Sequence, residues 1–313
     1  MNRFLDYASS KYYEGNPIIS DEEFDMLADY YKYESVGAPV KGDRIAHAFP
    51  MYSLQKVYEN EPRITLPGVA IAVTPKLDGA AVANYYVYGT HVLSLTRGDG
   101  KEGLDITEKM RILIPSTILY GDVPLIQVVG EVVAPKHIEN SRNYAAGALN
   151  LKCIEEFKQK EITFIAYGIK PNQYSTWTED MSKLCEVNQF STVYTSNDLD
   201  KYPQDGTVFR LDSYDEFEAA GYTSKHPRGA FALKKRQSGV VTKLLDIEWQ
   251  VGMSGVLTPV AILEPVKVGD AVVSRATLNN MGFIQAMDLD YNCFVEIERA
   301  GEIIPRVIRR VYE

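Results

Sequence analysis

The sequence has 313 residues, a formal net charge of −9 at pH 7 and 45% hydrophobic residues. A chain of this length can bury a large core and is expected to hold two or three domains. Its negative charge argues against a general nucleic-acid-binding surface, and no segment approaches the length of a membrane span. The first residues lack the apolar core of a signal peptide, so a cytosolic protein is expected.

The three cysteines, Cys153, Cys185 and Cys293, lie far apart in the sequence. They form neither a disulfide framework nor a Cys-x-x-Cys pair for zinc. We therefore expect no zinc site, and we interpret the cysteines as core or indifferent residues.

The stretch from Val69 to Gly100 alternates apolar runs with charged glycine-rich motifs. An apolar run leads into Lys76-Leu77-Asp78-Gly79, and two further runs flank a turn at Gly89-Thr90. The second of them ends on Arg97-Gly-Asp-Gly. This pattern predicts a β-hairpin with charge beside glycine at both ends. A lysine at a strand end, partly desolvated and near other cations, can lose its proton and act as a nucleophile.

A lone Lys-x-Asp-Gly recurs by chance in about one chain in twenty-five of this length. Here Thr-Arg-Gly-Asp-Gly-x-x-Gly-x-Asp-Ile-Thr follows at hairpin distance. The combination resembles the adenylation core of the NAD-dependent DNA ligases. The resemblance implies that Lys76 is the nucleophile, that Leu77 lies beside the nucleotide, and that Asp78 and Arg97 belong to the catalytic site.

Residues 1–45 are predicted to be helical, with a capping box formed by Ser20 and Glu23. The segment from Tyr12 to Asp25 resembles the small N-terminal domain of the same family, which holds the nicotinamide mononucleotide half of NAD. Tyr13 and Phe24 stand where a histidine and a tyrosine are usual. The residues implied in this role are Tyr12, Tyr13, Asp21, Phe24 and Asp25.

Further segments resemble the family in the same order. They are the connector His47 to Tyr58, the predicted strand Leu125 to Val133, the small-residue segment 140–149, and the predicted strand Ile162 to Ile169. The resemblance implies nucleotide contacts in each: Ser53 and Leu54 on the adenosine, Glu131 on the ribose or a metal, Arg142 near the phosphates and the nicked DNA, and Tyr167 stacked on the adenine.

Two later motifs complete the expected site. Asp205-Gly-Thr-Val208-Phe-Arg210 is similar to the family's Asp-Gly-x-Val-x-Lys strand, with arginine in place of lysine. Lys234 matches a lysine that contacts the α-phosphate. The resemblance implies that Val208, Arg210 and Lys234 bind the cofactor. It also implies that Mg²⁺ or Mn²⁺ is held by Asp78, Glu131 and Asp205.

The fold class is therefore expected to be α+β. We expect a helical domain over residues 1–45, a nucleotidyltransferase domain over 46–238 and an oligonucleotide-binding (OB) barrel over 239–313. No chemistry is expected between residues 171 and 200. Asn150, Gly229, Met253 and Asn279 stand where the family usually has arginine, tryptophan, arginine and histidine.

The resemblance implies a ligase that seals 5′-phosphate/3′-hydroxyl nicks in duplex DNA, for replication and repair, through lysyl-AMP and adenylylated DNA. We expect a monomer of phage or viral type in the cytoplasm of a bacterial or infected host cell. The family's zinc finger, helix-hairpin-helix and BRCT domains do not follow Glu313. Alternatives are an ATP-dependent ligase or capping-type enzyme, a self-adenylating subunit with a partner chain, and a DNA-binding relative without catalysis.

Overall fold

The computed structural model describes residues 2–13, 18–31, 33, 44–58, 64–120, 123–234, 239–251, 257–268, 271–300 and 304–312. The chain divides into two compact units, Met1–Lys235 and Arg236–Glu313. Among the described residues, no helix is both long and apolar enough to cross a bilayer.

The first unit contains a four-stranded antiparallel sheet in the order β5-β4-β7-β8. Its strands are β4 (Ala80–Val87), β5 (Thr90–Thr96), β7 (Leu125–Val133) and β8 (Thr163–Lys170). β4 and β5 form the predicted hairpin. Its two-residue loop is Tyr88-Gly89, with φ values of 44° and 80°, and positive φ at both loop positions matches the twist of the flanking strands.

A second four-stranded sheet, in the order β2-β10-β9-β3, carries the predicted lysine motif. Its strands are β2 (Gln55–Tyr58), β3 (Ile71–Leu77), β9 (Gln204–Leu211) and β10 (Ala230–Lys234). The β2–β10 pair is parallel and the other pairs are antiparallel. A two-stranded ribbon of β1 (Arg44–Ala46) and β6 (Glu102–Leu104) completes the strands of the unit.

Gly79 lets the chain pass from one four-stranded sheet to the other within two residues, Asp78 and Gly79. It lies between β3 and β4, and a Cβ atom there would sit 2.3 Å from the carbonyl oxygen of Val132. Gly206 has a similar role in β9, where a Cβ atom would lie 2.4 Å from the carbonyl oxygen of Leu233. Both glycines of the sequence motifs are therefore required by close backbone approach.

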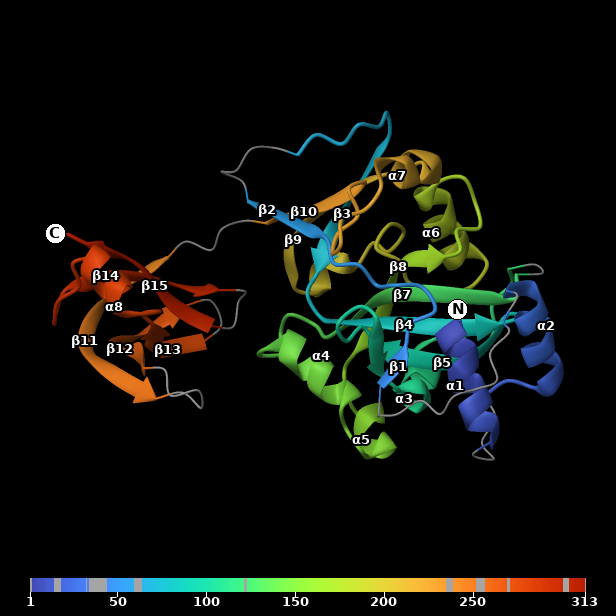
Figure 1. The fold of residues 1–313 in the computed structure, drawn as a ribbon, viewed down its shortest axis with the longest axis horizontal. Helices are drawn as coiled ribbons and strands as arrows, with labels where there is room; N and C mark the ends of the chain where they lie inside the picture. Colours follow the sequence, from blue (N-terminus) through green and yellow to red (C-terminus); the bar gives the residue numbers. More distant parts are fainter. Residues whose placement is uncertain are drawn as a thin grey trace. The chain divides into compact units, whose positions relative to one another are not determined.

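Helices cover the sheets of this unit (Figure 1). They are α1 (Asn2–Tyr13), α2 (Asp21–Tyr31), α3 (Thr107–Leu113), α4 (Ser141–Leu149), α5 (Ile154–Lys158), α6 (Trp177–Glu186) and α7 (Tyr214–Ala220), with a 3₁₀ turn η1 (Leu199–Lys201). The predicted capping box is present before α2. The Ser20 amide donates to Glu23 Oε2 at 2.8 Å, and the Glu23 amide donates to Ser20 Oγ at 3.2 Å.

α1 and α2 share a hydrophobic core with β4 and β5. Phe4, Leu5 and Leu27 are fully buried in one cluster with Tyr85, and the Phe4 and Tyr85 rings stack at 6.0 Å. One hydrophobic core therefore includes residues from both sides of the domain boundary expected near residue 45. Apolar residues at helical spacing bury themselves on the sheet rather than in a separate helical core.

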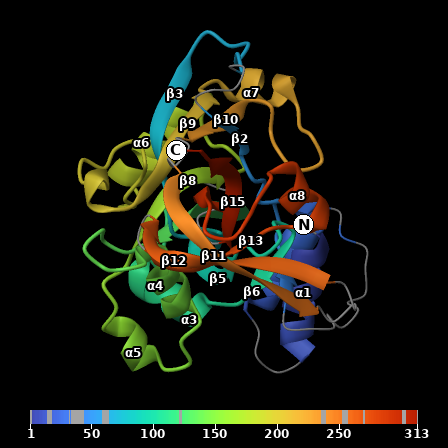
Figure 2. The same ribbon diagram turned by 90° about the vertical axis from the view of Figure 1, so that its left-hand side faces the viewer.

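The second unit is a closed five-stranded barrel in the order β11-β12-β13-β15-β14, as expected for an OB fold (Figure 2). Its elements are β11 (Val240–Val251), β12 (Leu257–Val268), β13 (Ala271–Thr277), α8 (Met281–Ala286), β14 (Phe294–Ala300) and β15 (Ile304–Val311). Leu244, Leu263 and Val295 fill its core.

Several arginines on the barrel form salt bridges with acidic side chains of the same unit. Arg309 Nε lies 2.6 Å from Glu296, and Arg310 lies 2.8 Å from Asp288. The other pairs are Arg275 with Glu248 and Arg306 with Glu298. The arginines at positions 306, 309 and 310 are thus ion-paired in this structure.

The shared core gives a stability prediction. Replacing Phe4 with alanine removes a fully buried ring, and the free energy of unfolding should fall by about 3 kcal/mol or more. The Phe4→Ala variant should lower the melting temperature of the whole first unit, measured by calorimetry. Tyr30→Ala, at a side chain that is 66% exposed, is the control and should change stability little. An unchanged main transition in Phe4→Ala would show that α1 folds apart from the sheet.

Candidate functional site

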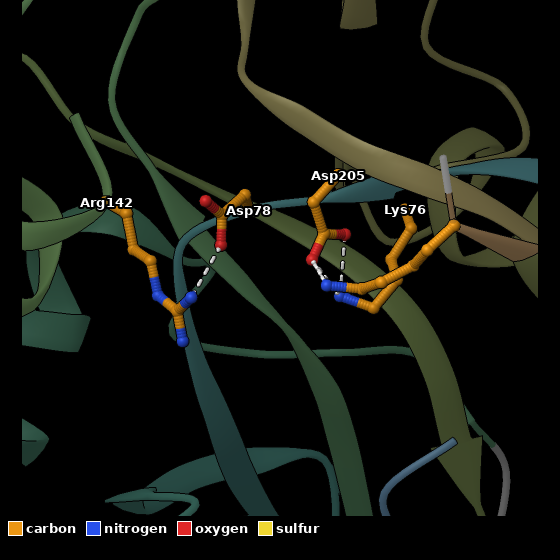
Figure 3. A network of polar contacts seen from close by, with 5 residues as sticks. Lys76, Asp78, Arg142 and Asp205 are labelled. Carbon is orange, nitrogen blue, oxygen red and sulfur yellow. Dashed lines mark hydrogen bonds and ion pairs between the residues drawn. The ribbon is translucent and has the colours of Figure 1, made fainter. Parts of the chain in front are cut away.

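Lys76 and Lys234 share one carboxylate, that of Asp205. The three residues lie on the neighbouring strands β3, β10 and β9. Lys76 Nζ lies 2.8 and 3.0 Å from the two oxygens of Asp205, and Lys234 Nζ lies 2.5 Å from Oδ2 (Figure 3). Asp205 is only 5% exposed, whereas Lys76 remains 26% exposed. The lysine that the sequence predicts as nucleophile is therefore both held in place and accessible.

The electrostatics of Asp205 follow from this bridge. Burial alone would raise the pKa of its carboxyl, but the ammonium groups of Lys76 and Lys234 outweigh burial, and the pKa lies below its usual value. Asp205 is therefore ionised at neutral pH. Two cations on one buried carboxylate leave an excess of positive charge, which suits a phosphate ligand.

Asp78 and Arg142 form a second ion pair beside the first. Arg142, near the start of α4, lies 3.2 Å from Asp78 Oδ1, and Figure 3 shows the two pairs side by side. The backbone amide of Asp78 also donates to the carbonyl of Pro203, which ties the lysine motif to the segment before Asp205. The motifs Lys-x-Asp-Gly, Asp205-Gly and 140–149 thus lie close together.

Glu131 and Tyr167 line the same region from β7 and β8. Burial raises the pKa of Glu131 to about 7, although Lys76 and Arg97 lower it. Burial also raises the pKa of Tyr167, and the charge of Glu131 adds to that effect. Within the described part of the chain no salt bridge reaches Glu131, unlike Asp78 and Asp205. A half-buried carboxylate without a salt bridge among the described residues is suited to accept hydrogen bonds from a ligand hydroxyl.

His47 fixes the backbone at Arg97, a role that the sequence did not indicate beyond its place in a connector. Its Nδ1 lies 2.7 Å from the Tyr85 hydroxyl and its Nε2 lies 3.0 Å from the Arg97 carbonyl oxygen. Burial lowers the pKa of His47, so the ring is neutral and can donate from one nitrogen and accept at the other. The adjacent Arg97 side chain is exposed.

The connector residues lie along β10. His226 Nδ1 is 2.8 Å from the carbonyl oxygen of Ser53, and Leu54 packs against the cluster around Phe231. Leu77, by contrast, is buried at the end of β3, and Val208 lies on β9 opposite Thr74. These placements bring the connector to the sheet that carries Lys76.

Arg210 and Phe24 are not brought to this group. Arg210 points its guanidinium over the rings of Phe217, Tyr214 and Trp177. Phe24 lies edge-to-face on Tyr33 at 6.1 Å and packs on the core around Tyr85. The side chains of Tyr12, Tyr13, Asp21 and Asp25, together with Met253, lie outside the described residues.

The expected three-carboxylate metal site is not formed. Among the described residues, no three His, Cys, Asp or Glu side chains lie close enough to hold a metal ion. The physical reason is that cations of the chain already occupy two of the three carboxylates: Asp205 pairs with two lysines and Asp78 pairs with Arg142.

Two family models match the chain. The NAD-dependent DNA ligase adenylation domain matches residues 41–196, and the NAD-dependent DNA ligase OB-fold domain matches residues 241–313. Together they cover well over half of the sequence. The chain belongs to the NAD-dependent DNA ligase family. The adenylation match includes Lys76, Glu131 and Tyr167, whereas Asp205 and Lys234 lie beyond it and join the site through the fold.

One curated relative and two solved structures are similar to this chain. DNA ligase 1 of Nocardia farcinica (strain IFM 10152) is 33% identical over 348 residues, which cover 95% of this chain and 52% of the relative. The chain thus spans about half the length of that curated relative. A Lig E DNA ligase described as a minimal scaffold for DNA binding matches 83% of this chain and 100% of its own, with a TM-score of 0.49 and 13% identity. Chlorella virus DNA ligase-adenylate matches the same shares, with a TM-score of 0.32 and 12% identity.

The raised pKa of Glu131 predicts a pH-dependent stability. From about 4.5 to about 7 the folded protein binds more protons at this carboxyl than the unfolded chain, so the free energy of unfolding falls as pH rises through that window. Glu131→Gln removes the ionisable carboxyl group and, with it, this loss of stability at high pH. The melting temperature of the variant relative to the unsubstituted protein should therefore be higher at pH 8 than at pH 5. Glu139→Gln, at an exposed position, is the control, and an equal difference at both pH values for Glu131→Gln would contradict the assignment.

Proposed function

We propose that this chain is an NAD-dependent DNA ligase that seals nicks in duplex DNA. The observation that carries the proposal is the pair of lysines, Lys76 and Lys234, converging on buried Asp205. One lysine is accessible for attack, and the other is placed to hold the phosphate that is attacked. Glu131 and Tyr167 beside them offer a hydrogen-bond acceptor and a half-buried ring for a nucleoside.

In the first step the amine of Lys76 attacks the α-phosphorus of NAD. A nitrogen–phosphorus bond forms, the bond to the bridging oxygen breaks, and nicotinamide mononucleotide leaves with that oxygen. Lys76 has to lose its ammonium proton first, and because its side chain is 26% exposed that proton can pass to water. Phosphoryl transfer depends mainly on positioning and charge neutralisation, which Lys234 and Arg97 supply.

In the later steps AMP passes from Lys76 to the 5′-phosphate of a nick, and the 3′-hydroxyl then displaces AMP. Arg142 lies on the exposed side of Asp78, with its side chain 43% exposed, and is placed to meet the DNA phosphate. The OB-fold unit is the expected second DNA contact. We place the protein in the cytoplasm of a bacterial or infected cell, acting as a monomer in replication and repair.

Magnesium or manganese fits this site only together with the phosphates. Mg²⁺ is commonly bound by one or two carboxylates and substrate oxygens rather than by an all-protein cage. Glu131 is the carboxylate that would hold it, and Asp205 would join as Lys76 and Lys234 pass from its oxygens to the phosphates. The ion would neutralise phosphate charge. Nicotinamide recognition is assigned to Tyr12, Tyr13, Asp21, Phe24 and Asp25, on the resemblance of their sequence to the family's N-terminal domain.

Mass spectrometry after incubation with NAD and magnesium tests the proposal. One adenylyl group should be added, and it should be absent from Lys76→Ala but present in Lys158→Ala, a control at an exposed lysine of α5. A label that persists in Lys76→Ala would refute the nucleophile. Labelling by ATP and not by NAD would refute the cofactor.

A gel assay with nicked duplex DNA separates two versions of the proposal. The purified chain should convert nicked strands to full-length product without any other protein. Normal adenylation without sealing would instead indicate a self-adenylating subunit that needs a second chain, since the curated relative is about twice as long. Neither adenylation nor sealing would leave only the DNA-binding alternative.

Lys234 gives a quantitative prediction. Removing one preorganised donor to a reacting phosphoryl group costs roughly a hundredfold or more in rate. Lys234→Ala should slow single-turnover formation of lysyl-AMP by that order, and Lys234→Arg should recover part of it because the charge is kept. An unchanged rate in Lys234→Ala would remove Lys234 from the reaction.

A further inference from the structure

Tyr167 occupies a β-bulge. In the β7–β8 ladder Gly130 pairs with Ala166 and Val129 pairs with Gly168, so Tyr167 is the extra residue between two paired positions. A bulge disrupts the ladder locally and turns the side chain of the extra residue. The orientation of the Tyr167 ring therefore depends on what holds the backbone at this point.

The indole of Trp177 holds the bulge. Its Nε1 donates a hydrogen bond of 3.0 Å to the carbonyl oxygen of Tyr167. A bulge carbonyl left without a donor inside the protein would cost free energy, so this contact stabilises the bulged backbone. Trp177 lies in the segment 171–200, where the sequence indicated no chemistry.

Trp177 is itself fixed from several sides. It is the first residue of α6 and is only 3% exposed. Its amide donates to the carbonyl of Asp212 at 2.8 Å, and the Asp212 carboxylate accepts from the amide and the hydroxyl of Thr178 at 2.8 and 2.9 Å. The ring of Tyr194 packs edge-on against the indole at 5.9 Å. The indole has little freedom to move away from Tyr167.

Arg210 packs among the aromatic rings around this indole. Its guanidinium carbon lies 4.1 Å from the ring centre of Phe217, 5.4 Å from that of Tyr214 and 5.7 Å from that of Trp177. Its Nε is buried and has no acceptor among the described residues. A planar guanidinium can stack between rings in a way that a lysine ammonium cannot. Arginine at this position of β9 therefore serves the aromatic cluster.

We propose that Trp177, supported by Arg210, is a positioning residue that sets the Tyr167 ring for the adenine of NAD. The identity of the nucleotide rests on the proposed function. The positioning role rests on the hydrogen bond between Trp177 and the bulged backbone at Tyr167. Trp177 touches no reacting atom. It acts through the Tyr167 backbone, so its loss should weaken nucleotide binding more than it slows the transfer step.

The test compares Trp177→Phe with the unsubstituted protein. Losing one hydrogen bond to the bulge should raise the KM for NAD in self-adenylation, and the Kd of AMP by calorimetry, roughly tenfold. The maximal adenylation rate should change less than about twofold, because Lys76 and Lys234 are untouched. Hydrogen exchange of residues 163–170 should accelerate. Trp249→Phe, the same change on the barrel, is the matched control and should alter none of these values.

Each outcome has a defined meaning. Unchanged KM and Kd in Trp177→Phe would overturn the proposal, and so would unchanged hydrogen exchange at 163–170. A wild-type chain that neither binds AMP nor reacts with NAD would refute the proposed function, while hydrogen exchange still decides whether Trp177 holds the bulge. A fall in maximal rate at constant KM would assign Trp177 to folding or to the transfer step.

A second variant covers the case in which Trp177→Phe does not fold. The chain has two tryptophans, Trp177 and Trp249, so in Trp249→Phe a tryptophan analogue enters only at position 177. β-(3-Benzothienyl)alanine keeps the ring shape but has sulfur in place of N–H. It should raise the KM for NAD as Trp177→Phe does, and a normal KM would overturn the proposal.

Arg210→Met separates support of the indole from phosphate binding. If Arg210 acts through Trp177, the KM for NAD should rise by less than in Trp177→Phe, and the double variant should be no worse than Trp177→Phe alone. A large fall in the maximal adenylation rate, additive with Trp177→Phe, would instead make Arg210 a phosphate ligand.

Discussion

The sharing of Asp205 by two lysines is the interaction on which the rest of the site depends. It requires the beginning of β9 to lie beside the ends of β3 and β10, and Gly206 allows this by letting β10 approach β9 closely. It also requires the lysine motif to turn sharply into the second sheet, which Gly79 allows. The carboxylate lowers the electrostatic cost of holding two ammonium groups together, and each ammonium remains placed for a phosphate. The two glycines, the order of the strands and the placement of the charged side chains therefore all follow from one requirement, that Lys76 and Lys234 both reach Asp205.

Around this bridge the first unit is built as a single packed body rather than as a catalytic domain with a loosely attached helical segment. Phe4 and Leu27 share their core with Tyr85 of the hairpin, and the neighbouring His47 connects the Tyr85 hydroxyl to the Arg97 backbone. The N-terminal helices are thus connected to a predicted catalytic arginine through two side chains. The packing of α1 on the sheet therefore affects the position of the Arg97 backbone.

Much of the fold could be predicted from sequence because the signals are local. β-Branched and aromatic runs around Gly89 predicted the hairpin, and the run around Glu131 predicted β7. The glycine motifs drew attention to Lys76, Asp78 and Asp205 as candidate site residues, and their roles stay predictions. The partner that each charged side chain contacts could not be predicted from such local signals. Asp205 and Asp78 are neutralised by cations far away in sequence, and Arg210 is drawn into rings from α6 and α7. Trp177 was missed because its role lies in one indole N–H at the start of α6 that donates to a backbone carbonyl of β8.

The salt bridges on the barrel have a consequence for how this unit would approach a polyanion. Each of Arg275, Arg306, Arg309 and Arg310 already has a carboxylate partner within its own unit. Engaging a phosphate would free the carboxylate of each pair, and a cation attracted to that carboxylate would offset an ion released from the polyanion. Because ion release is what makes such association steeply dependent on ionic strength, attachment through these arginines would be unusually tolerant of salt.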